Sequence, residues 1–149
     1  MHGLQAKRSV VFYSALILTV DRVLKIYFWQ NRSDYQNGFF VATLNPAAAF
    51  SLAIPQLVWW PLALLIIFYC LYQVFRQLEQ KQNYWPWILI ILGASSNMFD
   101  RIMYGGVLDY INLGWWPVFN LSDSMIVLAV GWLLIGPLLD HVRSSRKPL

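Results

Sequence analysis

The stretch that decides this fold runs from Asn97 to Asp123 and reads NMFDRIMYGGVLDYINLGWWPVFNLSD. It holds three of the seven acidic residues of the chain, Asp100, Asp109 and Asp123, and apolar runs flank it on both sides. A charged group beside hydrocarbon costs on the order of 2.5 to 3.5 kcal/mol, even on the insertion scales that give the smallest penalties. Charged residues kept in such a place are therefore candidates for a functional site.

The composition is that of a membrane protein. Hydrophobic residues make up 58% of the 149 residues and charged residues only 12%, whereas soluble domains contain about 25% charged residues. This length allows a single membrane domain over residues 1–149. The net charge of +4 does not indicate a nucleic-acid partner, because most basic residues lie at the two ends and in one short loop, where they set membrane orientation.

Four apolar segments are long enough to cross a membrane. We expect transmembrane helices at about residues 9–29, 57–75, 84–101 and 118–139. Lysine and arginine are concentrated before the first segment, between the second and third, and after the fourth, so these three regions should share the cytoplasmic side. The sequence therefore predicts an all-α polytopic membrane protein with both termini in the cytoplasm.

The two long loops on the opposite side contain sequences typical of β-strands. FFVATL at residues 39–44 and VLDYINL at residues 107–113 are rich in β-branched and aromatic residues. Gly105 and Gly106 precede the second of these and indicate the end of the third helix.

Polar side chains from five segments fall at one depth, near the outer membrane interface. They are Asp21 and Lys25 in the first helix, Asn45 in the first long loop, Asn97, Asp100 and Arg101 at the end of the third helix, Asp109 in the second long loop, and Asn120 and Asp123 at the start of the fourth helix. Charges scattered at random would also lie at the inner level within helices, and the sequence has none there apart from Asp140 beside the basic tail. We therefore expect one polar site that is open to water from the outer side.

The residue types at this site favour carboxylate chemistry. Neither histidine lies near it, the single cysteine, Cys70, sits in an apolar run as a packing residue, and the neighbouring lysine and arginine disfavour a hard metal ion. Two aspartates close together share a proton, so one acts as general base on water and the other as general acid. This is an aspartic protease mechanism, which needs no cofactor. The residues alone leave open whether Asp109 or Asp100 is the partner of Asp123.

Each of these residues also has a purely structural interpretation. Asp21 and Lys25, four residues apart, can form a buried ion pair. Asn120 can be the N-cap of the fourth helix, and Asp123 can complement the dipole of that helix. Asp100 can form a local ion pair with Arg101, the residue that follows it, or be a helix-end charge. Their coincidence at one depth is what favours a functional site.

Five motifs in this order resemble those of the lipoprotein signal peptidases, the type II signal peptidases of bacteria. They are Asp21-x-x-x-Lys25, Asn45-x-Ala-Ala-Ala-Phe50, Asn97-x-x-Asp100-Arg101, Gly106-Val107-x-Asp109-Tyr110 and Phe119-Asn120-x-x-Asp123. Each motif alone is weak, but five in the right order over nearly the whole chain are specific.

The resemblance implies an intramembrane-type aspartic endopeptidase of the bacterial inner membrane. Such an enzyme removes the signal peptide of a prolipoprotein just before a diacylglyceryl-modified cysteine, and globomycin inhibits it. The resemblance implies that the catalytic pair is Asp109 and Asp123. It implies that six further residues line or support the site, namely Asn45, Asn97, Arg101, Asn120, Asp21 and Lys25. It also implies a small β cradle from the loops at 30–56 and 105–117 on the extracytoplasmic face. The expected partners are a lipidated prolipoprotein and membrane lipids, and we expect a monomer.

Three positions depart from the usual pattern of this family. Ser96 and Ala47 stand where glycine is usual, and Ser122 stands where alanine is usual. The hydroxyl of Ser122 is placed in the sequence to hydrogen-bond Asp123. We expect an active enzyme, with these departures affecting substrate preference.

Two other classes of function compete with the peptidase. One is a membrane protein of the same fold that binds lipoprotein precursors without cutting them, against which the intact Asp109 and Asp123 count. The other is a small proton or ion pathway, which needs polar residues across the whole membrane. The inner halves of the helices are nearly bare of such residues, which disfavours a pathway.

Overall fold

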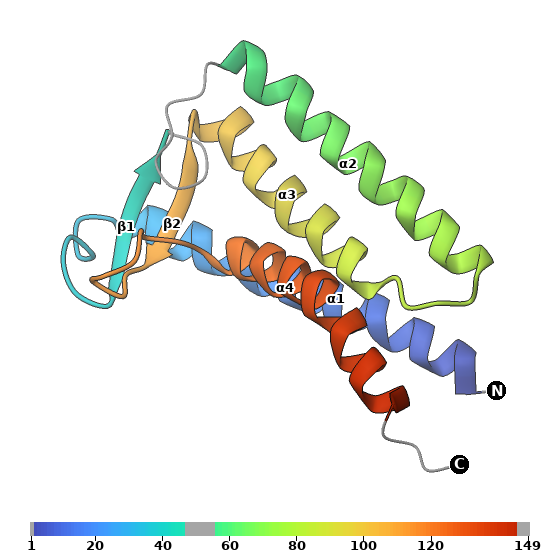
Figure 1. The fold of residues 1–149 in the computed structure, drawn as a ribbon. Helices are drawn as coiled ribbons and strands as arrows, with labels where there is room; N and C mark the ends of the chain where they lie inside the picture. Colours follow the sequence, from blue (N-terminus) through green and yellow to red (C-terminus); the bar gives the residue numbers. More distant parts are fainter. Residues whose placement is uncertain (1, 47–55, 146–149) are drawn as a thin grey trace.

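The computed structural model describes residues 2–46 and 56–145. Its elements, in chain order, are α1 (His2–Gln30), β1 (Phe40–Asn45), α2 (Gln56–Glu79), α3 (Trp85–Tyr104), β2 (Val107–Ile111) and α4 (Leu121–Ser145). The two strands lie at one end of the helices, and the start of α1 and the end of α4 lie at the other (Figure 1). The arrangement is therefore a bundle with a small sheet on one end.

The four predicted helical segments are all helices, although their ends differ from the prediction. α1 begins before residue 9, α2 continues past residue 75 into the polar sequence RQLE, and α4 begins at Leu121 rather than at residue 118. α4 starts later because Phe119 stays extended and forms an antiparallel β-bridge with Ile111, after which Asn120 caps the helix. α3 ends at Gly105, whose φ of 76° is the left-handed conformation that glycine adopts readily.

Two of the described helices are long and apolar enough to cross a membrane, over Val58–Glu79 in α2 and Leu121–Leu138 in α4. Their large apolar side chains face outward, with Phe68 of α2 66% exposed and Leu128 of α4 69% exposed. A soluble protein rarely leaves such a large apolar area uncovered. The exposed faces of these helices suit a lipid environment, and two of the four predicted spans are thus helices of membrane-crossing length and composition.

β1 and β2 form an antiparallel two-stranded sheet, which confirms that both loops contribute strands. Thr43 lies opposite Asp109 and Asn45 lies opposite Val107, with an irregularity of register between Phe40 and Thr43. Asn45 is therefore a diagonal neighbour of Asp109, within reach of its side chain. The register of this sheet places the last residue of β1 at the site.

α3 is the central helix, because it packs against α4 and α2 and also contacts α1. Gly93 permits the close approach of α4, since a Cβ atom at this position would lie 2.6 Å from the carbonyl oxygen of Ser122. A small apolar cluster of Cys70, Ile90 and Ala129 joins α2, α3 and α4. Cys70 is buried as predicted for a packing residue.

Candidate active site

Asp109 lies on β2 with both carboxylate oxygens hydrogen-bonded to asparagine side chains. Nδ2 of Asn45 donates to Oδ2 at 3.0 Å, and Nδ2 of Asn120 donates to Oδ1 at 2.7 Å. Burial, and after it the negative charge of Asp123, raise the pKa of Asp109 to about 7, although the two asparagine hydrogen bonds act to lower it. Asp109 can therefore hold or release a proton near neutral pH.

Asp123 lies in the first turn of α4 and forms a reciprocal cap with Asn120. Oδ1 of Asn120 accepts the backbone N–H of Asp123 at 2.8 Å, and Oδ2 of Asp123 accepts the backbone N–H of Asn120 at 3.2 Å. This pairing has the pattern of a capping box, so Asn120 is the N-cap that the sequence allowed. Because the amide nitrogen of the same side chain bonds Asp109, Asn120 joins the start of α4 to β2.

Asn97 of α3 holds the other oxygen of Asp123. Its Nδ2 donates to Oδ1 of Asp123 at 2.7 Å. Its own Oδ1 accepts from Nζ of Lys25 at 2.9 Å and from Nδ2 of Asn120 at 3.2 Å. Two donors on the carbonyl oxygen fix the orientation of this amide, so that its nitrogen faces Asp123.

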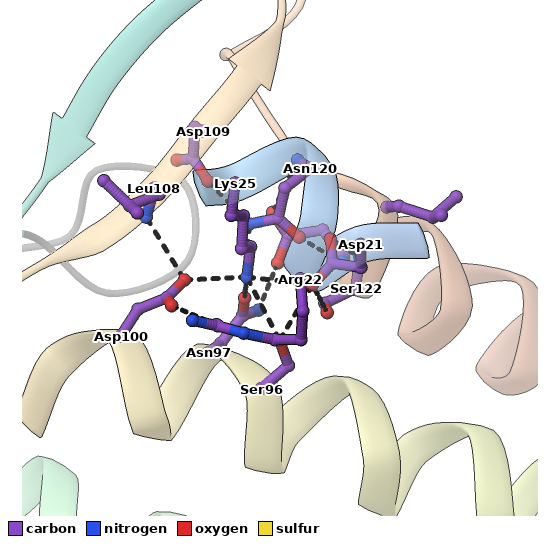
Figure 2. Close-up of polar contacts among 12 residues, drawn as sticks. Asp21, Arg22, Lys25, Ser96, Asn97, Asp100, Leu108, Asp109, Asn120 and Ser122 are labelled. Carbon is purple, nitrogen blue, oxygen red and sulfur yellow. Dashed lines mark hydrogen bonds and ion pairs between the residues drawn. The ribbon is translucent and has the colours of Figure 1, made fainter. Parts of the chain in front are cut away.

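Asp21 and Lys25 lie beside the two aspartates, in a buried cluster of charges. Nζ of Lys25 is 3.2 Å from Oδ2 of Asp21 and 2.7 Å from Oδ2 of Asp100, and all three side chains are 0% exposed. Figure 2 shows the Lys25 amine reaching between Asp100 and Asn97. The ion pair at i, i+4 is confirmed, and it is part of a larger network than the sequence indicated.

Asp100 has two ion-pair partners on α1 that the sequence did not indicate. Asp100 forms ion pairs with Arg22 and Lys25 of α1, and its Oδ2 also accepts the backbone N–H of Leu108 at 3.4 Å. Arg22 was not among the predicted site residues, because its spacing from the other polar residues forms no recognised motif. The available signal was the presence of a third charged residue in an apolar helix, next to Asp21.

Ser122 does not hydrogen-bond Asp123. Its hydroxyl donates to Oδ2 of Asp21 at 2.6 Å, and Ser96 of α3 donates to the same oxygen at 2.8 Å. Successive helical residues point about 100° apart, so a residue next to Asp123 faces a different neighbour. The third departure, Ala47, lies outside the described residues, as does the rest of its motif to Phe50.

Asp109 and Asp123 line one cavity of about 620 Å³. Asn45, Asn97 and Arg101 also line it. Apolar side chains from three helices form the rest of the wall, including Leu62 and Ile66 of α2, Ile90 and Ala94 of α3, and Ile126 and Val127 of α4. The cavity therefore has a polar part around the aspartates and an apolar part between the helices.

Arg101 lies on the α3 side of this cavity, where it contacts both α2 and its own helix. Its guanidinium carbon is 4.4 Å from the centre of the Trp59 ring, and its Nη1 donates to the carbonyl oxygen of Asn97 at 3.3 Å. Trp59 was not among the predicted site residues. Trp116, also not among them, lines the cavity as well.

The arrangement supports acid–base chemistry by two carboxylates. Asp109 and Asp123 face one cavity, are held by a shared asparagine, and differ in their surroundings. Such a pair can divide one proton between a general acid and a general base. Within residues 2–46 and 56–145, no three histidine, cysteine, aspartate or glutamate side chains are grouped to hold a metal ion.

Comparisons with known proteins identify the family. A family model described as signal peptidase (SPase) II matches residues 13–139. A lipoprotein signal peptidase of Syntrophomonas wolfei is 37% identical over 89% of this chain and 94% of that protein. One of Desulfitobacterium hafniense is 34% identical over 89% and 93%, and one of Vibrio cholerae is 31% identical over 92% and 88%.

The fold also has a counterpart among solved structures. A bacterial membrane enzyme solved by the in meso method superposes with a TM-score of 0.75, at 19% identity, over 95% of this chain and 94% of that chain. The fold is thus that of a known membrane enzyme, and the family match covers most of the chain. The chain belongs to the signal peptidase II family.

Proposed function

We propose that Asp109 and Asp123 are the catalytic pair with which this signal peptidase II, an aspartic peptidase, removes signal peptides from prolipoproteins. The observation that carries the proposal is that both carboxylates line one cavity and are joined through the side chain of Asn120. Asp100 is the weaker candidate, because its oxygens are engaged by Arg22, Lys25 and a backbone N–H.

We propose different roles for the two carboxyl groups. In this proposal Asp109, whose pKa is raised to about 7, starts as the protonated member. Asp123 lies in the first turn of α4, where the helix dipole favours a negative charge, and starts as the ionised member. Asp123 takes a proton from water as the water oxygen attacks the scissile carbonyl carbon, while Asp109 gives its proton to the carbonyl oxygen. Asp109 then recovers a proton from the resulting diol, Asp123 gives its proton to the leaving nitrogen, and the C–N bond breaks. Both aspartates end the cycle as they began.

Six residues support this pair in the proposal. Asn45, Asn97 and Asn120 each donate a hydrogen bond to one of the two carboxylates. Lys25 orients Asn97, and Asp21 pairs with Lys25. Arg101 lines the cavity and presents a positive charge where negative charge develops on the substrate.

The cavity suits a lipid-modified substrate. Its polar part holds the aspartates, and its apolar part, between α2, α3 and α4, can take an acyl chain or an apolar signal peptide. We propose that cleavage occurs before a diacylglyceryl-modified cysteine, in the inner membrane, with all four helices spanning it and the sheet on the extracytoplasmic side. We also propose that the protein acts as a monomer.

The test is cleavage of a peptide that contains a diacylglyceryl-modified cysteine by the purified protein in detergent. Asp109→Asn and Asp123→Asn are nearly isosteric and remove only the titrating group. Both should reduce cleavage by at least about 10³-fold, as expected for loss of an acid–base partner. Asp34→Asn, on an exposed loop residue, is the matched control and should cleave like the wild type.

Other outcomes separate the competing proposals. If folded wild-type protein binds the peptide but leaves it whole, it is a binding protein of the same fold. If Asp109→Asn stays active while Asp100→Asn is inactive and folded, the choice of Asp109 is wrong.

A further inference from the structure

We infer that Asp21, Ser96, Tyr110 and Ser122 form a clamp that sets the position of Asp123 relative to Asp109, with Ser96, Ser122 and Tyr110 as positioning residues for the cleavage reaction. This inference rests on the proposed roles of Asp109 and Asp123. These four residues are called the Asp21 clamp below.

The carboxylate of Asp21 is the centre of the clamp. Its Oδ2 accepts the hydroxyl of Ser96 at 2.8 Å and that of Ser122 at 2.6 Å. Its Oδ1 accepts the hydroxyl of Tyr110 and the backbone N–H of Ser122, both at 3.2 Å. One buried side chain of α1 thus holds α3, α4 and β2 (Figure 2 shows Asp21 with Ser96 and Ser122).

The position of the clamp in the sequence links it to the catalytic pair. Tyr110 directly follows Asp109, and Ser122 directly precedes Asp123. Oδ1 of Asp21 therefore binds the neighbour of each proposed catalytic residue. The Tyr110 hydroxyl also accepts the backbone N–H of Leu121 at 3.1 Å, which ties β2 directly to the first residue of α4.

The hydroxyls are not needed to neutralise Asp21, because Nζ of Lys25 lies 3.2 Å from it. Their contribution is geometric, since each hydroxyl directs one element toward a specific oxygen. Burial and the charge of Asp21 raise the pKa of Tyr110, so its hydroxyl remains a donor. Because a small misplacement of reacting groups can cost a large factor in rate, the clamp acts on the chemical step rather than on substrate binding.

The experiment compares Ser96→Ala, Ser122→Ala, Tyr110→Phe and the double serine variant in the same cleavage assay. Alanine is a better helix former than serine, which offsets part of the stability lost with each hydrogen bond. Tyr110→Phe keeps the ring that stacks on Phe28 at 5.1 Å. The matched controls are Ser95→Ala, next to Ser96 on α3, and Ser124→Ala, whose hydroxyl bonds only a backbone carbonyl in its own helix turn, at 3.2 Å.

The expected result is a fall in kcat of about 5- to 50-fold for each clamp variant, with KM changed by less than about 2-fold and with wild-type values for both controls. Because both serines act on one oxygen of Asp21, the double variant should lose less than the product of the two single losses.

Three results would overturn the inference. The first is wild-type kcat in Ser96→Ala and Ser122→Ala. The second is a loss that vanishes when activity is compared at equal folded fraction, which would show a role in stability alone. The third is a double serine variant whose loss in kcat equals the product of the two single losses. Asp109→Asn and Asp123→Asn are run alongside: if they are active, the proposed catalytic pair fails, and if they are inactive while the serine variants cleave normally, only the clamp fails.

Discussion

The side-chain nitrogen of Asn120 lies 2.7 Å from Oδ1 of Asp109, although Asn120 is also the N-cap of α4. The two polar atoms of the Asn120 side chain therefore have different roles. Its oxygen fixes the helix on which Asp123 stands, and its nitrogen holds the carboxylate on β2. A substitution can separate the two roles. Serine can cap a helix with its hydroxyl, but it has no side-chain amide to donate to Asp109.

Asn120→Ser should therefore keep the fold and lose activity. Serine and asparagine are comparable N-caps, so we expect thermal stability within about 1 kcal/mol of wild type. Cleavage should fall about 10-fold or more. The hydrogen bond from Asn120 lowers the pKa of Asp109, so its loss should raise that pKa further. Asn120→Ala, which loses the cap as well, should be both inactive and less stable. Equal stability loss in both variants would contradict this division of roles.

The pH profile of cleavage should show the titration of Asp109. As the general acid of the proposed mechanism, Asp109 must be protonated, and its pKa is about 7. We therefore expect kcat/KM to fall as pH rises through about 7, measured in a detergent in which the protein stays folded across the range. In Asn120→Ser this fall in kcat/KM should occur at higher pH, because the hydrogen bond that lowers the pKa of Asp109 is lost. A wild-type profile that stays flat well above neutral pH would contradict the assignment of Asp109 as the acid.

Asp109→Asn should gain stability relative to the wild type as the pH rises from acid to alkaline values. The pKa of Asp109 is raised from 3.8 to about 7 by folding. The folded state therefore holds a proton that the unfolded state releases between these values, and stability falls as pH rises through this window. This loss of stability in the wild type is complete above about pH 7 and amounts to at most about 4 kcal/mol. Thermal unfolding of Asp109→Asn and of the wild type at pH 4 and pH 8 measures this loss. The same difference in Tm between the two proteins at both pH values would contradict the prediction.

Lys25→Met should strongly destabilise the protein. Lys25 lies between the carboxylates of Asp21 and Asp100, and all three side chains are fully buried. Removing one partner of a buried ion pair leaves uncompensated charge and typically costs about 3 to 5 kcal/mol. Lys81→Met, at an exposed lysine in the turn after α2, is the control and should change the free energy of unfolding little. Unchanged thermal unfolding of Lys25→Met would show that the cluster is not important for stability.

Gly93→Ala should reduce both stability and cleavage by forcing α3 and α4 apart. A Cβ at Gly93 would lie 2.6 Å from the carbonyl oxygen of Ser122 and 2.9 Å from Cγ1 of Ile126. α4 carries Asp123, so separation of the helices moves one of the two proposed catalytic carboxylates relative to Asn97 of α3, which bonds it. Gly131→Ala, also in a helix but with no atom within 4 Å of the added Cβ, should be neutral or stabilise by up to about 1 kcal/mol. Similar behaviour of the two variants would contradict the close-packing role of Gly93.

Much of the fold follows from patterns that are local in the sequence. Long apolar segments predict the helices. Inside a membrane there is no water to bond the backbone N–H and C=O groups, so these groups must bond one another, as they do in a helix. The β-branched and aromatic residues before Asn45 and around Asp109 predict the two strands, and Gly105 predicts the end of α3. The i, i+4 spacing of Asp21 and Lys25 predicts their ion pair, since one turn of helix sets that distance.

The choice of partners between elements was decided only by the tertiary structure. Asp100 pairs with Arg22 and Lys25 of α1, and Ser122 bonds Asp21 instead of Asp123. Both results depend on which face of α1 meets α3 and α4. No local pattern contains that information, because helix period tells which residues share a face but not which helix that face contacts. The packing of α1 against α3, α4 and β2 decides it. The sequence by itself thus determined the helices, the strands and most residues of the candidate site, while packing decided which of them touch.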